Sequence, residues 1–291
     1  MSITLVHVVA LEDLGTSDST AFNLKRIASE LAESGISVDS AVRHGRAGKE
    51  ILAEIHDRSA ALIVMRTHGR FGVERAILGS VADQVLTHCR VPVVLMRPGE
   101  HRVTSIHTLV VPVDGSPGDE IAVRAAMDLA QATGAVINLV QVTVPLAMQG
   151  TVVYDDGGAG YYDSEWDDET VAAARGYVDG VVARLQESGV RADGEAPVAP
   201  NAAQAIVDTA ESNAADLIIM STRALTGPAR TLLGSVANEV VGTAHCPVVL
   251  LREKSEVVAT APPAICSAPN TISNADACGP GVERSRGLAQ R

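Results

Sequence analysis

The chain has 291 residues, a net charge of −12 and a hydrophobic fraction of 46%, but only 2% of its residues are aromatic. The acidic balance repels phosphate backbones and few aromatic side chains are available for base stacking, so nucleic acid is not an expected partner. No apolar run approaches the ~20 residues that span a bilayer, and the start lacks the features of a signal peptide, so we expect a cytoplasmic protein without membrane contact.

Short runs rich in β-branched residues alternate with amphipathic stretches, a pattern typical of βαβ units around a parallel sheet. In the first part we expect strands at 3–9, 36–43, 61–66 and 92–97, and helices near 20–34, 47–58 and 80–88. In the second part we expect strands at 107–113, 135–142, 190–197, 216–221 and 247–252, and helices near 117–133, 165–188, 202–213 and 235–243. The predicted fold class is therefore α/β.

An internal repeat explains the length of the chain. The segment from Leu62 to Arg97 recurs without a gap 155 positions later, from Leu217 to Arg252. A repeat this long indicates duplicated domains, in agreement with a prior of about one domain per 150 residues.

The repeat is incomplete at its beginning. Residues 4–10 match residues 138–144 at an offset of 134, so the strand, turn and helix expected within 107–134 have no counterpart in the first copy. We expect an N-terminally incomplete domain at 1–98 and a complete domain at 104–253. Residues 254–291, rich in Ala, Pro and Ser without periodicity, are expected to be a disordered tail.

Two groups of residues are weak candidates for metal binding. The four cysteines have no metal-binding spacing and are expected to be free thiols: Cys89, Cys246, Cys266 and Cys278. The loop from Pro145 to Trp166 holds carboxylates that could bind a divalent cation, but a solvated lid is the favoured interpretation. Its acidic and aromatic residues are Asp155, Asp156, Asp163, Glu165, Asp167, Asp168, Tyr154, Tyr161, Tyr162 and Trp166.

The turn after the first strand of the second copy contains a candidate ligand-binding carboxylate. Ser116 is expected to cap the following helix, with Pro117 in its first position and Asp119 as the acid of a capping box. Asp114 is not needed for this turn. It lies at the carboxyl end of a strand, where open α/β sheets bind ligands, and it can accept hydrogen bonds from a ribose hydroxyl or an adenine amino group.

A second candidate element follows the fourth strand of this copy. Gly234 and Ser235 begin the next helix, where exposed N–H groups and the helix dipole attract phosphate. Helix capping alone would also explain this pair, but its combination with Asp114 favours a nucleotide.

These residues resemble those of the universal stress protein family. In that family a Gly-x-x-Gly pair and a later Gly-Ser or Gly-Thr pair after strand four hold the phosphates of ATP, and an Asp after strand one holds the nucleoside. The later pair is present here as Gly79-Ser80 and Gly234-Ser235, and the resemblance covers about residues 2–253. It implies an open, mostly parallel five-stranded sheet with helices on both faces, Rossmann-like and similar to the adenine nucleotide alpha hydrolases, duplicated in this chain.

The resemblance also implies an ATP site in the second domain, with or without Mg, formed by Pro112, Val113, Asp114, Val142, Met220, Ser221, Ala224, Gly234, Ser235 and Val236. Two of these residues depart from the family pattern. Ser221 and Ala224 replace the two glycines of the first pair, so positive φ angles are harder to reach there. We therefore expect weakened ATP binding rather than none.

The first copy departs further from the family. Arg66 replaces the first glycine, although Gly69, Gly79 and Ser80 fit, and the copy has no counterpart of Asp114. We predict no ATP in the first domain.

The family's strand order, 3-2-1-4-5, makes the strand that this copy lacks the central one. Its two neighbours would lose their shared partner, which would leave ladder hydrogen bonds unsatisfied. We favour a mis-assigned or truncated start, with another chain or direct strand pairing as alternatives.

The leading functional hypothesis is a regulatory stress-response protein that binds ATP in its second domain and is not an enzyme, although slow hydrolysis remains open. One alternative is an interaction scaffold of the same family that binds no nucleotide. The other is an adenylate-forming or nucleotide-hydrolysing enzyme. The resemblance further implies association through the last strands, Pro92–Arg97 and Pro247–Arg252, as an intramolecular pseudo-dimer or a homodimer.

Overall fold

The computed structural model describes residues 2–33, 35–67, 78–97, 103–145, 153–154, 160–161, 164–222 and 233–252. In the first half these form β1 (Ser2–Val9), a 3-10 helix η1 (Leu11–Thr16), α1 (Ser17–Ala32), β2 (Ser37–His44), α2 (Ala47–Arg58), β3 (Ile63–Arg66), α3 (Ser80–His88) and β4 (Val93–Met96). Each helix and strand expected in this half is present within a few residues of its expected bounds, whereas η1 was not predicted. The expected tail lies outside the described residues.

The second half contains β5 (Thr108–Pro112), α4 (Asp119–Thr133), β6 (Val136–Val140), β7 (Val153–Tyr154), β8 (Gly160–Tyr161), α5 (Ser164–Glu187), β9 (Ala192–Glu195), α6 (Ala202–Ser212), β10 (Leu217–Thr222), α7 (Ser235–Thr243) and β11 (Val248–Arg252). The short antiparallel pair β7 and β8 falls within the acidic loop and was not predicted. Most of that loop, including the candidate cation ligands Asp155, Asp156 and Asp163, lies outside the described residues, whereas Glu165, Asp167 and Asp168 fall within α5.

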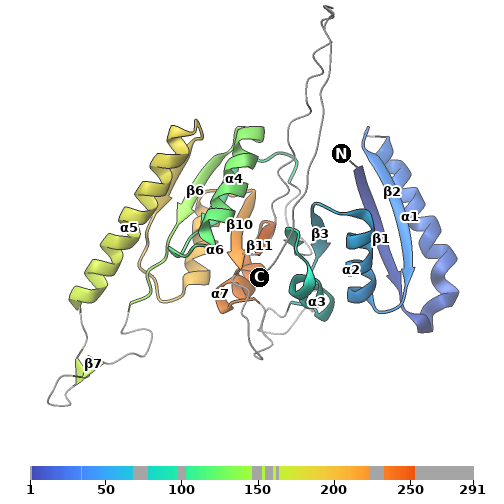
Figure 1. The fold of residues 1–291 in the computed structure, drawn as a ribbon, viewed down its shortest axis with the longest axis horizontal. Coiled ribbons are helices and arrows are strands. Elements are labelled where there is room, and N and C mark those ends of the chain that lie inside the picture. Colours follow the sequence, from blue (N-terminus) through green and yellow to red (C-terminus); the bar gives the residue numbers. More distant parts are fainter. Residues whose placement is uncertain are drawn as a thin grey trace, which may run out of the picture. The chain divides into compact units, whose positions relative to one another are not determined.

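The second half is a parallel sheet in the order β9-β6-β5-β10-β11, which is the expected order 3-2-1-4-5. Because successive strand residues point to opposite faces, Leu109 and Val111 pack on one side and Val110 on the other. Helices α4 and α5 cover the first face, and α6 and α7 cover the second (Figure 1). The predicted α/β fold with helices on both faces is confirmed.

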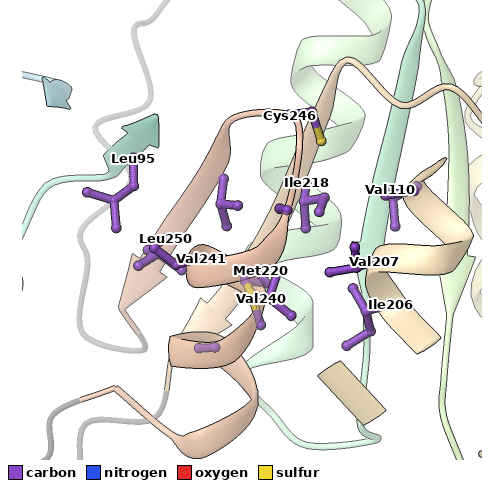
Figure 2. Packing of buried hydrophobic residues seen from close by; sticks show 14 of the residues in the cluster. Leu95, Val110, Ile206, Val207, Ile218, Met220, Val240, Val241, Cys246 and Leu250 are labelled. Carbon is purple, nitrogen blue, oxygen red and sulfur yellow. The ribbon is translucent and has the colours of Figure 1, made fainter. Parts of the chain in front are cut away.

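The core on the α6 and α7 face is aliphatic, as the composition predicts. Figure 2 shows Val110 and Ile218 on neighbouring strands, with Ile206 of α6 and Val240 of α7 beside them. Val110, Ile218 and Val240 have no exposed surface. Complete burial of such a side chain stabilises the fold by roughly 1.5–3 kcal/mol, so this core fixes the positions of β5 and β10.

The two halves join through their last strands. β4 pairs with β11 in antiparallel orientation, which produces a seven-stranded sheet in the order β3-β4-β11-β10-β5-β6-β9. Two equivalent arginines cross this junction: Arg97 donates to the carbonyl of Ala244 at 3.1 Å, and Arg252 donates to the carbonyl of Cys89 at 3.5 Å. Both carbonyls follow the last turn of a helix, where a cation is favoured. The contact expected for the last strands is therefore present within one chain.

In the first half the sheet is divided. β1 pairs with β2 in a separate two-stranded parallel sheet, whereas β3 pairs with β4 in the large sheet. Within the described residues no strand pairing links β1 to β3, so these two strands do not pair directly. Among the described helices, none combines the length and apolar character needed to cross a membrane.

The close approach of β9 to α5 gives a test of the packing. A Cβ atom added to Gly194 would lie 2.3 Å from Cγ1 of Val178 on α5, so Gly194→Ala requires the Val178 side chain or one of the two elements to shift. We expect a loss of about 1–3 kcal/mol in the free energy of unfolding, measured by urea denaturation.

Gly176 of the same helix is the matched control, because a Cβ there meets no atom within 4 Å. Gly176→Ala should stabilise the protein by about 0.5–1 kcal/mol through its higher helix propensity. Equal effects of the two substitutions would contradict the packing described for β9.

Candidate functional site

A cavity of about 450 Å³ opens at the carboxyl ends of β5 and β10, the adjacent strands at which the chain order of the sheet reverses. Open α/β sheets bind their ligands at this point, and the volume falls in the usual range for small-molecule sites. The cavity brings together all but one of the predicted site residues: Pro112, Val113, Asp114, Val142, Met220, Ser221, Gly234, Ser235 and Val236. The remaining one, Ala224, lies outside the described residues.

The turn that carries Asp114 differs from the expected one. Helix α4 begins at Asp119 with Gly118 as its N-cap, so the prediction that Ser116 caps this helix is wrong. The main-chain carbonyl of Ser116 instead accepts the N–H of Asp119 at 3.1 Å. Pro117 and Gly118 form a turn before the helix. The first helical residue is therefore Asp119, rather than Pro117 as the capping pattern indicates.

Asp114 also contributes to its own turn, contrary to the expectation that the turn does not need it. Its Oδ1 accepts the N–H of Ser116 at 3.0 Å, as in an Asx-turn. Gly115 has a φ of +80°, which favours glycine. The side chain of Asp114 is exposed at the cavity. Its carboxylate is therefore held by a local hydrogen bond where a ligand can reach it.

Asp119 is a cavity residue that the sequence did not identify as part of the site. Its side chain is buried, and its Oδ2 accepts the N–H of Asp114 at 3.0 Å and of Gly115 at 2.7 Å. The hydroxyl of Tyr177, from α5, donates to the same oxygen at 3.1 Å. Asp119 therefore connects the turn that presents Asp114 to a helix distant in sequence.

The ionisation of Asp119 is perturbed by this environment. Burial raises the pKa of its carboxyl group, and the negative charge of Asp114 raises it further, whereas the three hydrogen-bond donors act in the opposite direction. The pKa of Tyr177 is raised to about 12, first by burial and then by the adjacent Asp119. At neutral pH the tyrosine hydroxyl thus keeps its proton and acts as a donor.

The start of α7 forms another wall of the cavity. Gly234 is its N-cap, with no side-chain hydrogen bond to the first turn, and the N–H of Asn238 makes the first bond of the helix to the carbonyl of Gly234. The N–H groups of Ser235, Val236 and Ala237 precede that bond, so an α-helix supplies no acceptor for them. These donors and the positive end of the helix dipole suit an anion.

The fold itself does not require glycine at position 234. Its φ of −58° is open to any residue, and an added Cβ would meet no atom of the described residues within 4 Å. A side chain there would instead occupy space beside the cavity. Backbone strain therefore does not explain the glycine at position 234.

The rest of the lining is mostly apolar. It comes from β6, α6 and β10 and from the residues that follow β5 and β6: Val113, Val140, Val142, Ile206 and Met220. Ser221 stands at the first glycine position of the expected motif. It lies within β10 in extended backbone, so this position needs no positive φ and a serine fits it. Its Oγ lies only 3.2 Å from the position of a Cβ on Gly118, and therefore Gly118 makes room for this serine.

The charged residues among the described lining are both acidic, Asp114 and Asp119. Within the described residues no group of three or more His, Cys, Asp or Glu side chains is arranged to hold a metal ion. The cavity therefore offers carboxylate acceptors at the β5 turn and main-chain donors at α7, on either side of an apolar surface.

The first half has only part of this arrangement. Gly79 is the N-cap of α3 with a φ of −59°, and Ser80 begins the helix, as Gly234 and Ser235 do for α7. Arg66 ends β3 and is exposed, whereas Gly69 lies outside the described residues. The half retains the helix N-terminus suited to phosphate, but no described residue takes the place of Asp114.

Two relatives and a solved structure resemble the chain. A universal stress protein of Methanocaldococcus jannaschii is 51% identical over 51 residues, which are 18% of this chain and 30% of that protein. One of Mycobacterium tuberculosis is 26% identical over 202 residues, which are 67% of this chain and 62% of that protein. The matches thus span less than two thirds of either relative.

The fold is similar to the crystal structure of a universal stress protein from Archaeoglobus fulgidus, with a TM-score of 0.65, 19% identity and coverage of 87% of this chain and 86% of that one. The model of the Universal stress protein family matches residues 2–97 and 105–252, one stretch in each half. These stretches make up most of the chain and include both sides of the cavity, so the chain belongs to the universal stress protein family.

Proposed function

We propose that the second half binds an adenine nucleotide, ATP in the first instance, and that the protein acts as a nucleotide-dependent regulator of the stress response. The observation that supports this most strongly is the presence, on one cavity, of the Asp114 carboxylate and the α7 N-terminus at Gly234. A carboxylate acceptor suits a nucleoside, and main-chain donors at a helix N-terminus suit phosphate.

The residues of the cavity fit the parts of such a ligand. Asp114 would accept hydrogen bonds from ribose hydroxyls or the adenine amino group, and Val142 and Ile206 offer apolar surface for the base. The N–H groups of Ser235 and Val236 and the hydroxyl of Ser235 would donate to phosphate oxygens. Since the described charges of the cavity are negative, we expect the nucleotide to bind as its Mg²⁺ complex, which carries less negative charge.

Binding rather than turnover is the activity that this arrangement supports. Asp119 is engaged by the N–H groups of Asp114 and Gly115 and by Tyr177. Asp114 holds the N–H of Ser116. Both carboxylates thus have structural duties, which makes either a poor general base for fast hydrolysis.

An interaction scaffold that binds no nucleotide is the second candidate. The observations that favour it are the acidic lining of the cavity, which opposes polyphosphate, and Ser221 in place of a family glycine. The two functions differ in what they require of Asp114 and Gly234, because a scaffold needs neither for binding.

Calorimetric titration of Mg-ATP into the full chain distinguishes the two functions. We expect one saturable site, with affinity reduced about tenfold or more by Asp114→Ala, which removes the nucleoside acceptor, and by Gly234→Val, which fills the approach to the α7 N-terminus.

The matched control is Gly79→Val at the equivalent helix start of the first half, where no ATP is expected. It should leave the affinity unchanged. Absence of binding at millimolar ATP by a folded chain would support the scaffold instead, and an equal loss with Gly79→Val would place the nucleotide elsewhere.

The protonation of Asp119 gives a second measurable property of the site. A pKa raised in the folded state means that the unfolded chain releases its proton first. The free energy of unfolding contributed by this group therefore falls as the pH rises from the ordinary carboxyl value of 3.8 towards the raised value.

Asp119→Asn does not titrate, so the difference in unfolding free energy between wild type and variant should fall over that interval and then level off. Urea denaturation at a series of pH values measures it, and Asp128→Asn, an exposed substitution on the same helix, is the control. Parallel profiles for wild type and Asp119→Asn would show that Asp119 is not perturbed.

A further inference from the structure

The turn that carries Asp114 leaves the sheet as it enters the cavity. The N–H of Val113 still bonds to the carbonyl of Val140, on the neighbouring strand, at 3.0 Å. The next two N–H groups, those of Asp114 and Gly115, donate instead to Oδ2 of Asp119 at 3.0 and 2.7 Å. A buried carboxylate thus takes the place of a neighbouring strand at the position of the candidate nucleoside contact.

This turn has little stiffness of its own. It contains Gly115 and Gly118, and glycine has the largest backbone freedom of any residue, so fixing such a turn costs more conformational entropy. Asp119 holds the turn from both ends: its N–H donates to the carbonyl of Ser116 at 3.1 Å, and its carboxylate accepts the N–H groups of Asp114 and Gly115. The orientation of the Asp114 side chain therefore depends on Asp119.

Tyr177 of α5 supports Asp119 in this role. Its hydroxyl donates at 3.1 Å to the same oxygen that accepts the two N–H groups of the turn. Burial, and then the charge of Asp114, raise the pKa of Asp119, whereas the hydrogen bond from Tyr177 acts in the opposite direction. The hydroxyl therefore favours the ionised carboxylate, which is the stronger acceptor for the turn.

The side chain of Tyr177 and the start of α7 lie on opposite faces of the sheet. Tyr177 packs against the cluster that contains Val111 of β5 and Val123 of α4. Leu233 and Val236, at the start of α7, pack against the other cluster. The hydrogen bond from Tyr177 thus acts on the carboxylate side of the cavity, away from the main-chain donors of α7.

We propose that Tyr177 is a positioning residue of the nucleotide site, which holds the Asp114 turn through Asp119 and thereby sets the strength of the nucleoside contact. This inference rests on the proposed function, because that function assigns Asp114 to the nucleoside. It adds that control of the contact lies in α5, a helix that contributes none of the described lining residues.

A double-mutant cycle on the full chain, measured by calorimetric titration of Mg-ATP, tests this inference. Tyr177→Phe keeps the aromatic ring and removes only the hydroxyl. We expect it to weaken Mg-ATP binding about three- to tenfold, and by the same factor in Gly234→Ala, which changes the phosphate side. In Asp114→Ala the turn no longer carries the nucleoside contact, so Tyr177→Phe should change the affinity by less than about twofold.

Arg184→Gln is the matched control on the same helix. Arg184 pairs with Glu120 of α4 at 3.3 Å, and both side chains are more than half exposed. The substitution removes another contact between α5 and α4 but leaves the Tyr177 hydroxyl in place. Since exposed pairs contribute little, its affinity for Mg-ATP should equal that of the wild type. An equal loss with Arg184→Gln and Tyr177→Phe would overturn the inference, because general loosening of α5 would then explain both.

Hydrogen exchange without nucleotide measures the turn itself. Tyr177→Phe should speed exchange at the amides of Asp114 and Gly115 but not at that of Asn238, which bonds within α7. Unchanged exchange, an unchanged affinity for Mg-ATP, or the same loss in Asp114→Ala as in the wild type overturns the inference and leaves the proposed function in place. A wild-type chain that binds no Mg-ATP overturns the proposed function, and this inference with it.

Discussion

The central position of β5 is the constraint from which the second half takes both its fold and its candidate site. A strand hydrogen-bonded on both sides and covered on both faces is mostly apolar, and Leu109, Val110 and Val111 are completely buried. The same strand ends where the chain order of the sheet reverses, so the residue that follows it is delivered to the cavity. One segment thus completes the sheet and presents Asp114. In the first half no described residue replaces β5, so β1 and β3 lie in different sheets and the counterpart of Asp114 is missing for the same reason.

To present the Asp114 carboxylate at this point, the turn must be held rigidly while the carboxylate keeps acceptor positions for a ligand. Gly115 adopts the positive φ, and Asp119 accepts the N–H groups of Asp114 and Gly115. The cost is a buried carboxylate close to Asp114, which the raised pKa of Asp119 reflects. Tyr177 offsets part of that cost with a hydroxyl donor from α5. The α5 helix follows the acidic loop in the chain, so the turn at the cavity is connected to the segment in which the two halves differ most in length.

The sequence predicted those parts of the molecule that depend on pattern and repetition. Alternating β-branched and amphipathic stretches located the helices and strands, and the two offsets of the repeat identified β1 and β3 as strands that lack a shared neighbour. The role of Asp119 could not be predicted in this way, because its partner Tyr177 is 58 residues away and becomes a neighbour only through packing. The predicted cap of α4 was wrong for a local reason. A Ser-Pro pair fits either a helix cap or a turn before the helix, and here the buried Asp119 accepts N–H groups of the preceding turn while Gly118 is the N-cap. The positions of Ala224 and Gly69 remain predictions.

Duplication allows the pairing of the two halves and the formation of the cavity to depend on different strands. The junction of the halves depends on β4, β11 and the arginines that follow them, and both halves retain these features: Arg97 reaches the carbonyl after α7, and Arg252 reaches the one after α3. The candidate nucleoside contact, Asp114, depends on the β5 segment, which only the second half has among the described residues. Because the junction lies at the last strands and the cavity at the first and fourth, the absence of a counterpart of Asp114 from the first half leaves the pairing surface intact. The first half therefore extends the sheet of the second half through β4 and β3.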